Sequence, residues 1–269
     1  PWRLDILEGL LGADVVGFHT EEYARHFLHC VTRLTDYQVD TARMTVKKGR
    51  RQVRIIAAPI GIPVEEVQTM AADPEVAAAA DKLKESVGNR RIILGVDRLD
   101  YTKGIPERLL AYEEFLRSDR SNRNRYCLVQ VMVPSRQDVE AYARLKQDVD
   151  QLVGDINGRY SATGRVAIHY LFRNLDKTSR YAHYRAADVG LITPLRDGMN
   201  LVAKEYVAAQ PSEDPGVLIL SRFAGAAHEL HSAILVNPYD VEATAGAIAR
   251  ALDMPVEERK ERWTAMMAR

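Results

Sequence analysis

The first residues that can do chemistry lie on a loop that carries one Arg and one Lys. The stretch G-V-D-R-L-D-Y-T-K-G-I-P at residues 95–106 follows a short apolar run, leads into a helical pattern, and contains Arg98 and Lys103. Arg can bind two phosphate oxygens at once and Lys acts as a point charge, so this pair suits a diphosphate. The residues alone leave a second interpretation open, in which Arg98 and Lys103 simply pair with Asp97 and Asp100 on a solvated loop.

A second loop brings acids and a free helix start. The stretch T-P-L-R-D-G-M-N-L-V-A-K-E-Y-V-A-A-Q at residues 193–210 also follows an apolar run, and its pattern predicts a strand, a loop and the beginning of a helix. Unpaired N–H groups and the helix dipole favour an anion at such a position. Glu205 lies one turn into the helix, where it can accept hydrogen bonds from sugar hydroxyls. An ordinary helix entry capped by Asp197 and Asn200 is the open alternative.

Three further loops repeat this design after other apolar runs. P-S-R ends at Arg136, N-L-D covers residues 174–176, and S-R-F-A-G-A-A covers residues 221–227. The small residues of the last loop would let its backbone approach a ligand closely. Arg136 alone is equally well explained as a free surface Arg. If the preceding runs are parallel strands, all five loops lie on one edge of a sheet and form one cleft.

The elements that must position these loops alternate regularly. Strands alternating with helices predict an α/β fold with a doubly wound parallel sheet and right-handed crossovers. The predicted strands are 92–96, 126–133, 166–171, 189–192, 217–220 and 233–236. The predicted helices are 106–117, 138–156, 176–186, 201–209, 241–252 and 256–267.

The first part of the chain has a different organisation. The segment A-P-I-G-I-P at residues 58–63 stops any regular element and marks a domain boundary. We therefore divide the chain into residues 1–58, 59–252 and a C-terminal helix at 253–269. Before the boundary we expect helices at 4–11 and 21–34, a strand at 14–18, and a hairpin of 39–46 with 52–57. After it, residues 63–87 predict two helices that break near Asp73.

Composition excludes several classes of protein. Lys plus Arg and Asp plus Glu both total 37, so no global basic excess indicates nucleic-acid or anionic-membrane binding. No apolar run approaches the roughly 18 residues that span a bilayer. Cys30 and Cys127 lack metal-ligand spacing and are predicted to be buried thiols of a reducing compartment. These observations lead us to expect a cytoplasmic protein. Because the sequence begins at Pro1 without a Met, we also expect it to be part of a longer chain.

Motifs for common cofactors are missing. GxGxxG and GxxxxGK[ST] do not occur, which argues against NAD and against P-loop ATP hydrolysis. His19, His26 and His29 have no nearby residues that complete a metal-ligand set, so packing or surface roles are favoured. The sequence therefore predicts neither cofactor nor metal.

Taken together, these motifs resemble one family. G-V-D-R-L-D-Y-T-K-G, P-S-R, the whole 193–210 stretch, L-S-x-F-A-G-A-A and V-N-P-Y-D occur in the order found in the trehalose-6-phosphate synthase family. The resemblance implies a retaining glycosyltransferase of the two-domain GT-B type, with a Rossmann-like C-terminal domain. It implies transfer of glucose from a nucleotide-glucose, UDP-glucose foremost, to glucose 6-phosphate, giving trehalose 6-phosphate. The G-L-L-G-A-D-V-V-G-F-H-T segment resembles the end of the family's amino-terminal acceptor domain.

The resemblance also assigns roles to the donor-site residues. Arg98 and Lys103 would hold the diphosphate and stabilise charge on it as it leaves, in a front-face transfer that needs no metal. Leu201 and Val202 would present backbone amides to the diphosphate, and Glu205 would bind the ribose.

The sugar, the base and the acceptor have their own residues. Arg136 would reach the phosphate of glucose 6-phosphate. Leu175 matches the position whose backbone meets the nucleobase, and Leu there leaves UDP, ADP and GDP open. The glucose hydroxyls would be held by Asp197 and the backbone of Gly198, Met199 and Asn200.

Most of the family's amino-terminal domain has no counterpart in these residues, including a glycine-rich donor loop and a histidine near the donor glucose. Two other interpretations therefore stay open. One is a related synthase with another acceptor, such as glucosylglycerol-phosphate synthase, and the other is a non-catalytic nucleotide-sugar-binding or regulatory domain. The oligomeric state is open as well, a homo-oligomer included.

Overall fold

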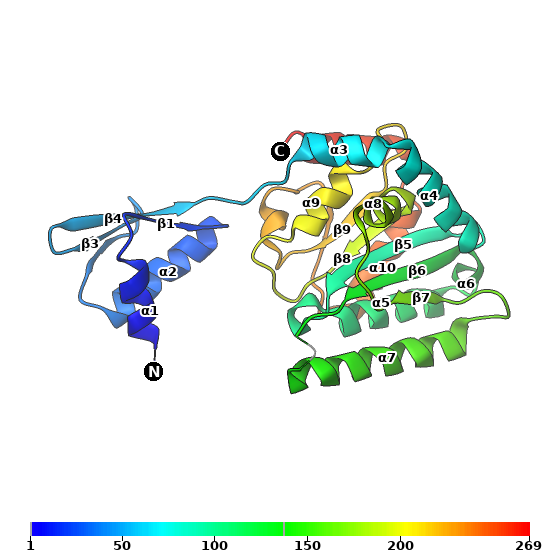
Figure 1. The fold of residues 1–269 in the computed structure, drawn as a ribbon, viewed down its shortest axis with the longest axis horizontal. Helices are drawn as coiled ribbons and strands as arrows, with labels where there is room; N and C mark the ends of the chain where they lie inside the picture. The colour runs from blue at the N-terminus through cyan, green and yellow to red at the C-terminus, as the bar shows by residue number, and fades with distance from the viewer. Residues whose placement is uncertain (1, 137) are drawn as a thin grey trace. The chain divides into compact units, whose positions relative to one another are not determined.

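The computed structural model describes residues 2–136 and 138–269 and divides the chain into two compact units (Figure 1). The first ends at Gly61 and the second runs from Ile62 to Arg269. The division falls in the Pro- and Gly-rich segment where the sequence predicts a boundary. Each unit has its own hydrophobic core.

Unit 1 is a small sheet with two helices. Its strand order is β1-β4-β3-β2, with β1 parallel to β4 and the other two pairings antiparallel. The predicted strand over residues 39–46 is wrong, because a turn divides it into β2 and β3. In that turn the Asp40 carboxylate accepts from the N–H groups of Ala42 and Arg43. The elements are α1 (Arg3–Leu10), β1 (Val15–Phe18), α2 (Glu21–Leu34), β2 (Gln38–Asp40), β3 (Thr45–Lys48) and β4 (Arg51–Ala57).

Helix α2 begins and ends at the predicted residues, but its Cys30 is not buried as predicted. The Thr20 hydroxyl accepts from the Tyr23 N–H and caps the helix. Its buried stripe consists of Ala24, Phe27, Leu28 and Val31. Cys30 lies off that stripe and is exposed, so the prediction that it is buried is wrong, whereas Cys127 is buried in the second unit.

Unit 2 is built on a parallel sheet of six strands in the order β10-β9-β8-β5-β6-β7. The chain winds outward from β5 in one direction and from β8 in the other. The neighbouring strands β5 and β8 therefore form the switch point, where open parallel sheets bind ligands beyond the carboxyl ends. The strands are β5 (Arg91–Arg98), β6 (Tyr126–Val133), β7 (Ile168–Leu171), β8 (Val189–Ile192), β9 (Val217–Ser221) and β10 (Ile234–Val236).

Helices cover both faces of this sheet (Figure 1). Ile92 and Leu94 of β5 pack with α3, α4, α8 and α9 on one face, while Ile93 packs with α5, α7 and α10 on the other. A strand that is buried on both faces explains the continuous apolar runs of the sequence. The helices are α3 (Val64–Ala72), α4 (Pro74–Ser86), α5 (Ile105–Ser118), α6 (Asn122–Arg125), α7 (Glu140–Tyr160), α8 (Lys177–Ala186), α9 (Leu201–Ala208), α10 (Val241–Leu252) and α11 (Val256–Met267).

Helix α11 is part of this unit. The Trp263 indole N–H donates to the Val207 carbonyl of α9 at 2.9 Å, and the Arg262 guanidinium donates to the Ser232 carbonyl at 2.9 Å. No helix among the described residues has the length and apolar character required to cross a membrane.

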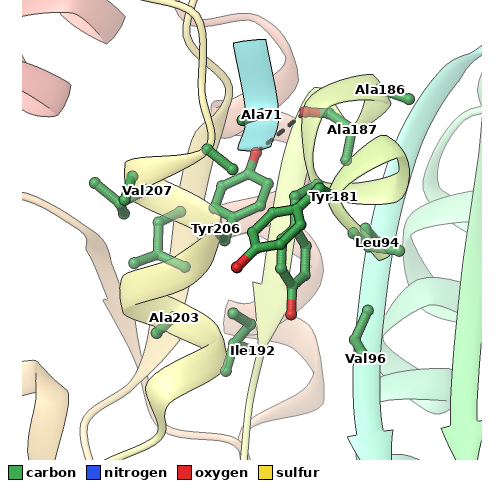
Figure 2. Close-up of a cluster of buried hydrophobic side chains, with 14 of the residues drawn as sticks. Ala71, Leu94, Val96, Tyr181, Ala186, Ala187, Ile192, Ala203, Tyr206 and Val207 are labelled. Carbon is green, nitrogen blue, oxygen red and sulfur yellow. Dashed lines mark hydrogen bonds between the residues drawn. The ribbon is translucent and has the colours of Figure 1, made fainter. Parts of the chain in front are cut away.

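Figure 2 shows the core between the sheet and helices α8 and α9, where Tyr206 packs among Leu94, Ile192 and other apolar side chains. The Tyr206 hydroxyl donates to the Ala187 carbonyl at 3.2 Å. The Tyr206 ring leaves no space above β8, because a Cβ added at Gly190 would lie 2.8 Å from it. Gly190 therefore sets how closely α9 approaches the sheet.

We expect Gly190→Ala to lower the free energy of unfolding by about 1–3 kcal/mol, the usual cost of overpacking a core. Urea denaturation measures this change. Gly154→Ala on α7 is the matched control, because a Cβ there would meet none of the residues that the structure describes within 4 Å. In a helix interior that exchange should stabilise by up to about 1 kcal/mol. Equal effects at the two sites would contradict the close approach at Gly190.

Candidate functional site

The loops after β5 and β8 are tied together by their backbones. The Thr102 carbonyl accepts from the N–H groups of Leu195 and Arg196 at 2.8 and 3.1 Å. Gly104 has a φ of +62°, and a Cβ there would lie 2.5 Å from the Thr193 carbonyl oxygen. This close approach brings residues that are far apart in the sequence to one point on the sheet edge.

Lys103 and Asp197 meet across these loops. The Lys103 ammonium lies 2.6 Å from the Asp197 carboxylate, and their side chains are only 16% and 13% exposed. The same carboxylate accepts from the Asn200 side-chain amide at 3.0 Å and from the Met199 N–H at 3.3 Å. An ammonium has three donors. Lys103 can therefore keep Asp197 in place and still donate to a bound anion.

The amino end of α9 has two free backbone donors. The Asn200 side chain caps the helix by accepting from the Ala203 N–H at 3.0 Å. Among the described residues, no hydrogen-bond partner accepts from the N–H groups of Leu201 and Val202. Capping and anion binding are thus compatible at this site. Asp197 is engaged by Lys103 as well as by the backbone of its own loop.

Beside these loops lies a pocket of about 270 Å³. The strand ends and the β7–α8 loop form one part of its wall, and α8 and α9 form the other. The Tyr184 hydroxyl donates to the Glu205 carboxylate at 2.9 Å. Burial and the neighbouring carboxylate raise the pKa of Tyr184, so this hydroxyl stays protonated at neutral pH. Four of the predicted site residues line the pocket, namely Arg98, Leu175, Val202 and Glu205.

Arg98 is the exposed cation of this pocket. Within the described part of the chain its guanidinium makes no hydrogen bond or ion pair, so all its donors are available to a ligand. The alternative of a loop whose charges pair with one another is wrong. Asp97 pairs with Arg108 instead, and the Asp100 carboxylate accepts from Thr102 and Tyr142.

Beneath the loops lies a buried network centred on Arg108. Its guanidinium donates to the Asp97 carboxylate, to the Thr193 hydroxyl at 3.1 Å and to the Gln130 side chain at 3.2 Å. A longer bond of 3.4 Å reaches the Lys103 carbonyl. Burial raises the pKa of Asp97, and the Arg108 cation opposes that shift. The network joins the residue before Arg98 to both loops of the switch point.

Arg136 and the loop at 221–227 do not lie in the pocket, although the sequence predicts that all five loops form one cleft. Arg136 has a φ of +45° and donates to the Tyr142 hydroxyl at 3.0 Å, and it does not line the pocket. The small residues of the loop at 221–227 approach protein backbone. A Cβ added at Gly225 would lie 2.0 Å from the Gly198 carbonyl oxygen. This loop instead supports the segment around Asp197. The Asp197 N–H donates to the Phe223 carbonyl at 3.2 Å.

In the described residues, no group of three or more His, Cys, Asp or Glu side chains is arranged to hold a metal ion. His26 of α2 lies 3.8 Å from the Glu22 carboxylate, one turn before it on the same helix.

A model of glycosyltransferase family 20 matches residues 1–269. The chain belongs to glycosyltransferase family 20. Its relatives within the family include a bifunctional trehalose-6-phosphate synthase/phosphatase of Thermoproteus tenax, which is 47% identical over 268 residues. A trehalose-6-phosphate synthase of a Mycobacterium species is 45% identical over 274 residues. These matches cover 100% and 99% of this chain but only 36% and 56% of the relatives, so the chain spans about half of their length or less.

Solved structures of the family have the same fold. The trehalose-6-phosphate synthase of E. coli, bound with UDP-2-fluoro glucose, matches with a TM-score of 0.94 and 42% identity, over 100% of this chain and 59% of that one. The UDP-forming alpha,alpha-trehalose-phosphate synthase of Burkholderia xenovorans, in complex with glucose-6-phosphate, matches with a TM-score of 0.96 and 40% identity. That match covers 100% of this chain and 60% of the other. The predicted α/β fold of GT-B type, with a Rossmann-like C-terminal unit, is confirmed.

Three residues of the candidate site were not identified from the sequence. Arg180 and Tyr184 line the pocket from α8, and Arg108 supports the loops from α5. The spacing of Arg180 and Tyr184 places them on one helix face, which is the available signal. Nothing in the sequence marks the surroundings of Arg108 as buried.

Proposed function

We propose that this chain carries the donor-binding part of a retaining glycosyltransferase. The donor is a nucleotide-glucose, with UDP-glucose foremost, and the acceptor is glucose 6-phosphate, so that the complete enzyme makes trehalose 6-phosphate. Membership of family 20 and the names of the similar proteins support this activity. The observation that carries the proposal is the Arg98 guanidinium, which lines a pocket and pairs with no other described residue, near Lys103 and the Leu201 and Val202 amides.

The residues divide the donor between them. Arg98 and Lys103 bind the diphosphate together with the Leu201 and Val202 amides, because all four supply donors where negative charge accumulates. During transfer that charge grows on the leaving diphosphate. Cations already in position stabilise it without reorganisation.

The sugar groups meet the acids of the site. Glu205 accepts from the ribose hydroxyls, and its carboxylate is already oriented by Tyr184. Leu175 borders the part of the pocket that takes the base. Arg136 binds the phosphate of the acceptor. The glucose hydroxyls are held by Asp197 and by the backbone of Gly198, Met199 and Asn200.

Binding and turnover separate this function from its alternatives. We expect the 269-residue chain to bind UDP-glucose and UDP in calorimetry and to form little trehalose 6-phosphate when glucose 6-phosphate is added. The chain covers only 59% of the length of the E. coli structure, which is why we expect little turnover. Absence of binding to any nucleotide sugar would overturn the proposal.

A further inference from the structure

Arg180 of α8 is a second arginine of the pocket, beside Arg98. It lines the pocket, and its buried Nε atom has no hydrogen-bond partner among the described residues. Its guanidinium lies 5.5 Å from the ring centroid of Tyr181. Within the described residues it forms no salt bridge with a carboxylate. A buried donor without an acceptor is unfavourable, so a ligand that supplies the acceptor gains from meeting it.

The position of Arg180 indicates which part of a ligand it meets. Residues four apart share a helix face, so Arg180 lies one turn from Tyr184, which holds the Glu205 carboxylate. Arg180 is nearer than Tyr184 to the amino end of α8 and to the preceding loop. Asn174 and Leu175 of that loop also line the pocket. This step rests on the proposed function, in which Arg98 takes the diphosphate and Glu205 the ribose. The next group along the pocket is then the base.

The chemistry of a guanidinium restricts the base. Arg offers only donors. Guanine presents two neighbouring acceptors, O6 and N7, and adenine places an amino donor beside N7. Uracil, with carbonyl oxygens at C2 and C4, also supplies acceptors without an amino group. We propose that Arg180 is a specificity-determining residue that selects a carbonyl-bearing base, uracil or guanine, over adenine.

The test compares three diphosphates on the same chain. UDP, GDP and ADP are titrated calorimetrically into the wild type and into Arg180→Leu, which removes the donors but keeps an apolar stem. The wild type should bind UDP, GDP or both at least tenfold more tightly than ADP. Arg180→Leu should weaken that binding by roughly 10- to 100-fold, the range for a charge-assisted hydrogen bond. ADP affinity should change by less than about threefold, so the preference disappears.

The ADP titration is the control for charge, because ADP carries the same diphosphate. An equal loss for all three ligands would show that Arg180 attracts anions in general and would overturn the proposal. A preference that survives in Arg180→Leu would overturn it as well. If the wild type bound no diphosphate at all, the proposed function itself would fail.

Tighter binding of UDP identifies a uracil carbonyl as the acceptor, and tighter binding of GDP identifies the O6 and N7 edge of guanine. Circular dichroism checks that the variant is folded.

Discussion

Arg108→Met should lower the free energy of unfolding of unit 2 by about 3–5 kcal/mol, the usual cost of breaking a buried ion pair from one side. The Arg108 and Asp97 side chains are 0% and 2% exposed. Removing the cation leaves the Asp97 carboxylate without its charged partner. The Gln130 side chain and the Thr193 hydroxyl also lose their shared donor.

Urea denaturation followed by Trp263 fluorescence, with Trp2 replaced by Phe, reports on unit 2 alone. The double variant Asp97→Leu/Arg108→Met should be more stable than Arg108→Met, because it removes both charges together. Arg117→Met is the matched control. Its guanidinium pairs with Glu114 but is 65% exposed, so the change should stay below about 1 kcal/mol. A loss at Arg108 no larger than at Arg117 would contradict the importance of this network.

Arg98→Ala should weaken binding of UDP-glucose by roughly 1.5–3 kcal/mol, which is the range for hydrogen bonds to charged groups. The guanidinium is exposed, lines the pocket and makes no hydrogen bond or ion pair with the described residues. No hydrogen bond or ion pair with the described residues is lost with it, so the free energy of unfolding should stay within about 0.5 kcal/mol of the wild type. A loss of affinity without a loss of stability is the expected signature.

Calorimetry with UDP-glucose and with inorganic diphosphate measures the effect of Arg98→Ala. Both ligands should lose affinity, because the proposed contact is to the diphosphate. Arg144→Ala on α7 is the control, since that side chain is 71% exposed and pairs with Glu140 on its own helix. Equal affinities of Arg98→Ala and Arg144→Ala for these ligands would contradict the assignment of Arg98 to the diphosphate site.

The repeating strands and helices of unit 2 were predictable because each signal is local. Helices α10 and α11 and strands β6 and β8 begin and end at the predicted residues. The carboxyl ends of parallel strands share one edge, so residues on those loops could be placed together from sequence alone. Arg98 and Lys103 were found in this way.

Pairings across the fold were not predictable from residue order. Lys103 and Asp197 are separated by 94 positions, and their contact depends on β5 lying beside β8. Arg108 lies on a helix whose pattern does not show that its guanidinium is buried beneath two loops. In unit 1, the Asp40 turn interrupts what the pattern predicts as one strand. Periodicity does not register a side chain that competes for backbone N–H groups.

A crystal structure of the 269-residue chain soaked with UDP-glucose tests the donor site most directly. We expect the diphosphate within hydrogen-bond distance of Arg98, Lys103 and the Leu201 and Val202 amides, and the ribose hydroxyls on Glu205. Lys103 should keep its contact with Asp197. Density for the nucleotide elsewhere, for example in the unit 1 hollow lined by His26, His29 and Cys30, with the Arg98 pocket empty, would contradict the proposed site.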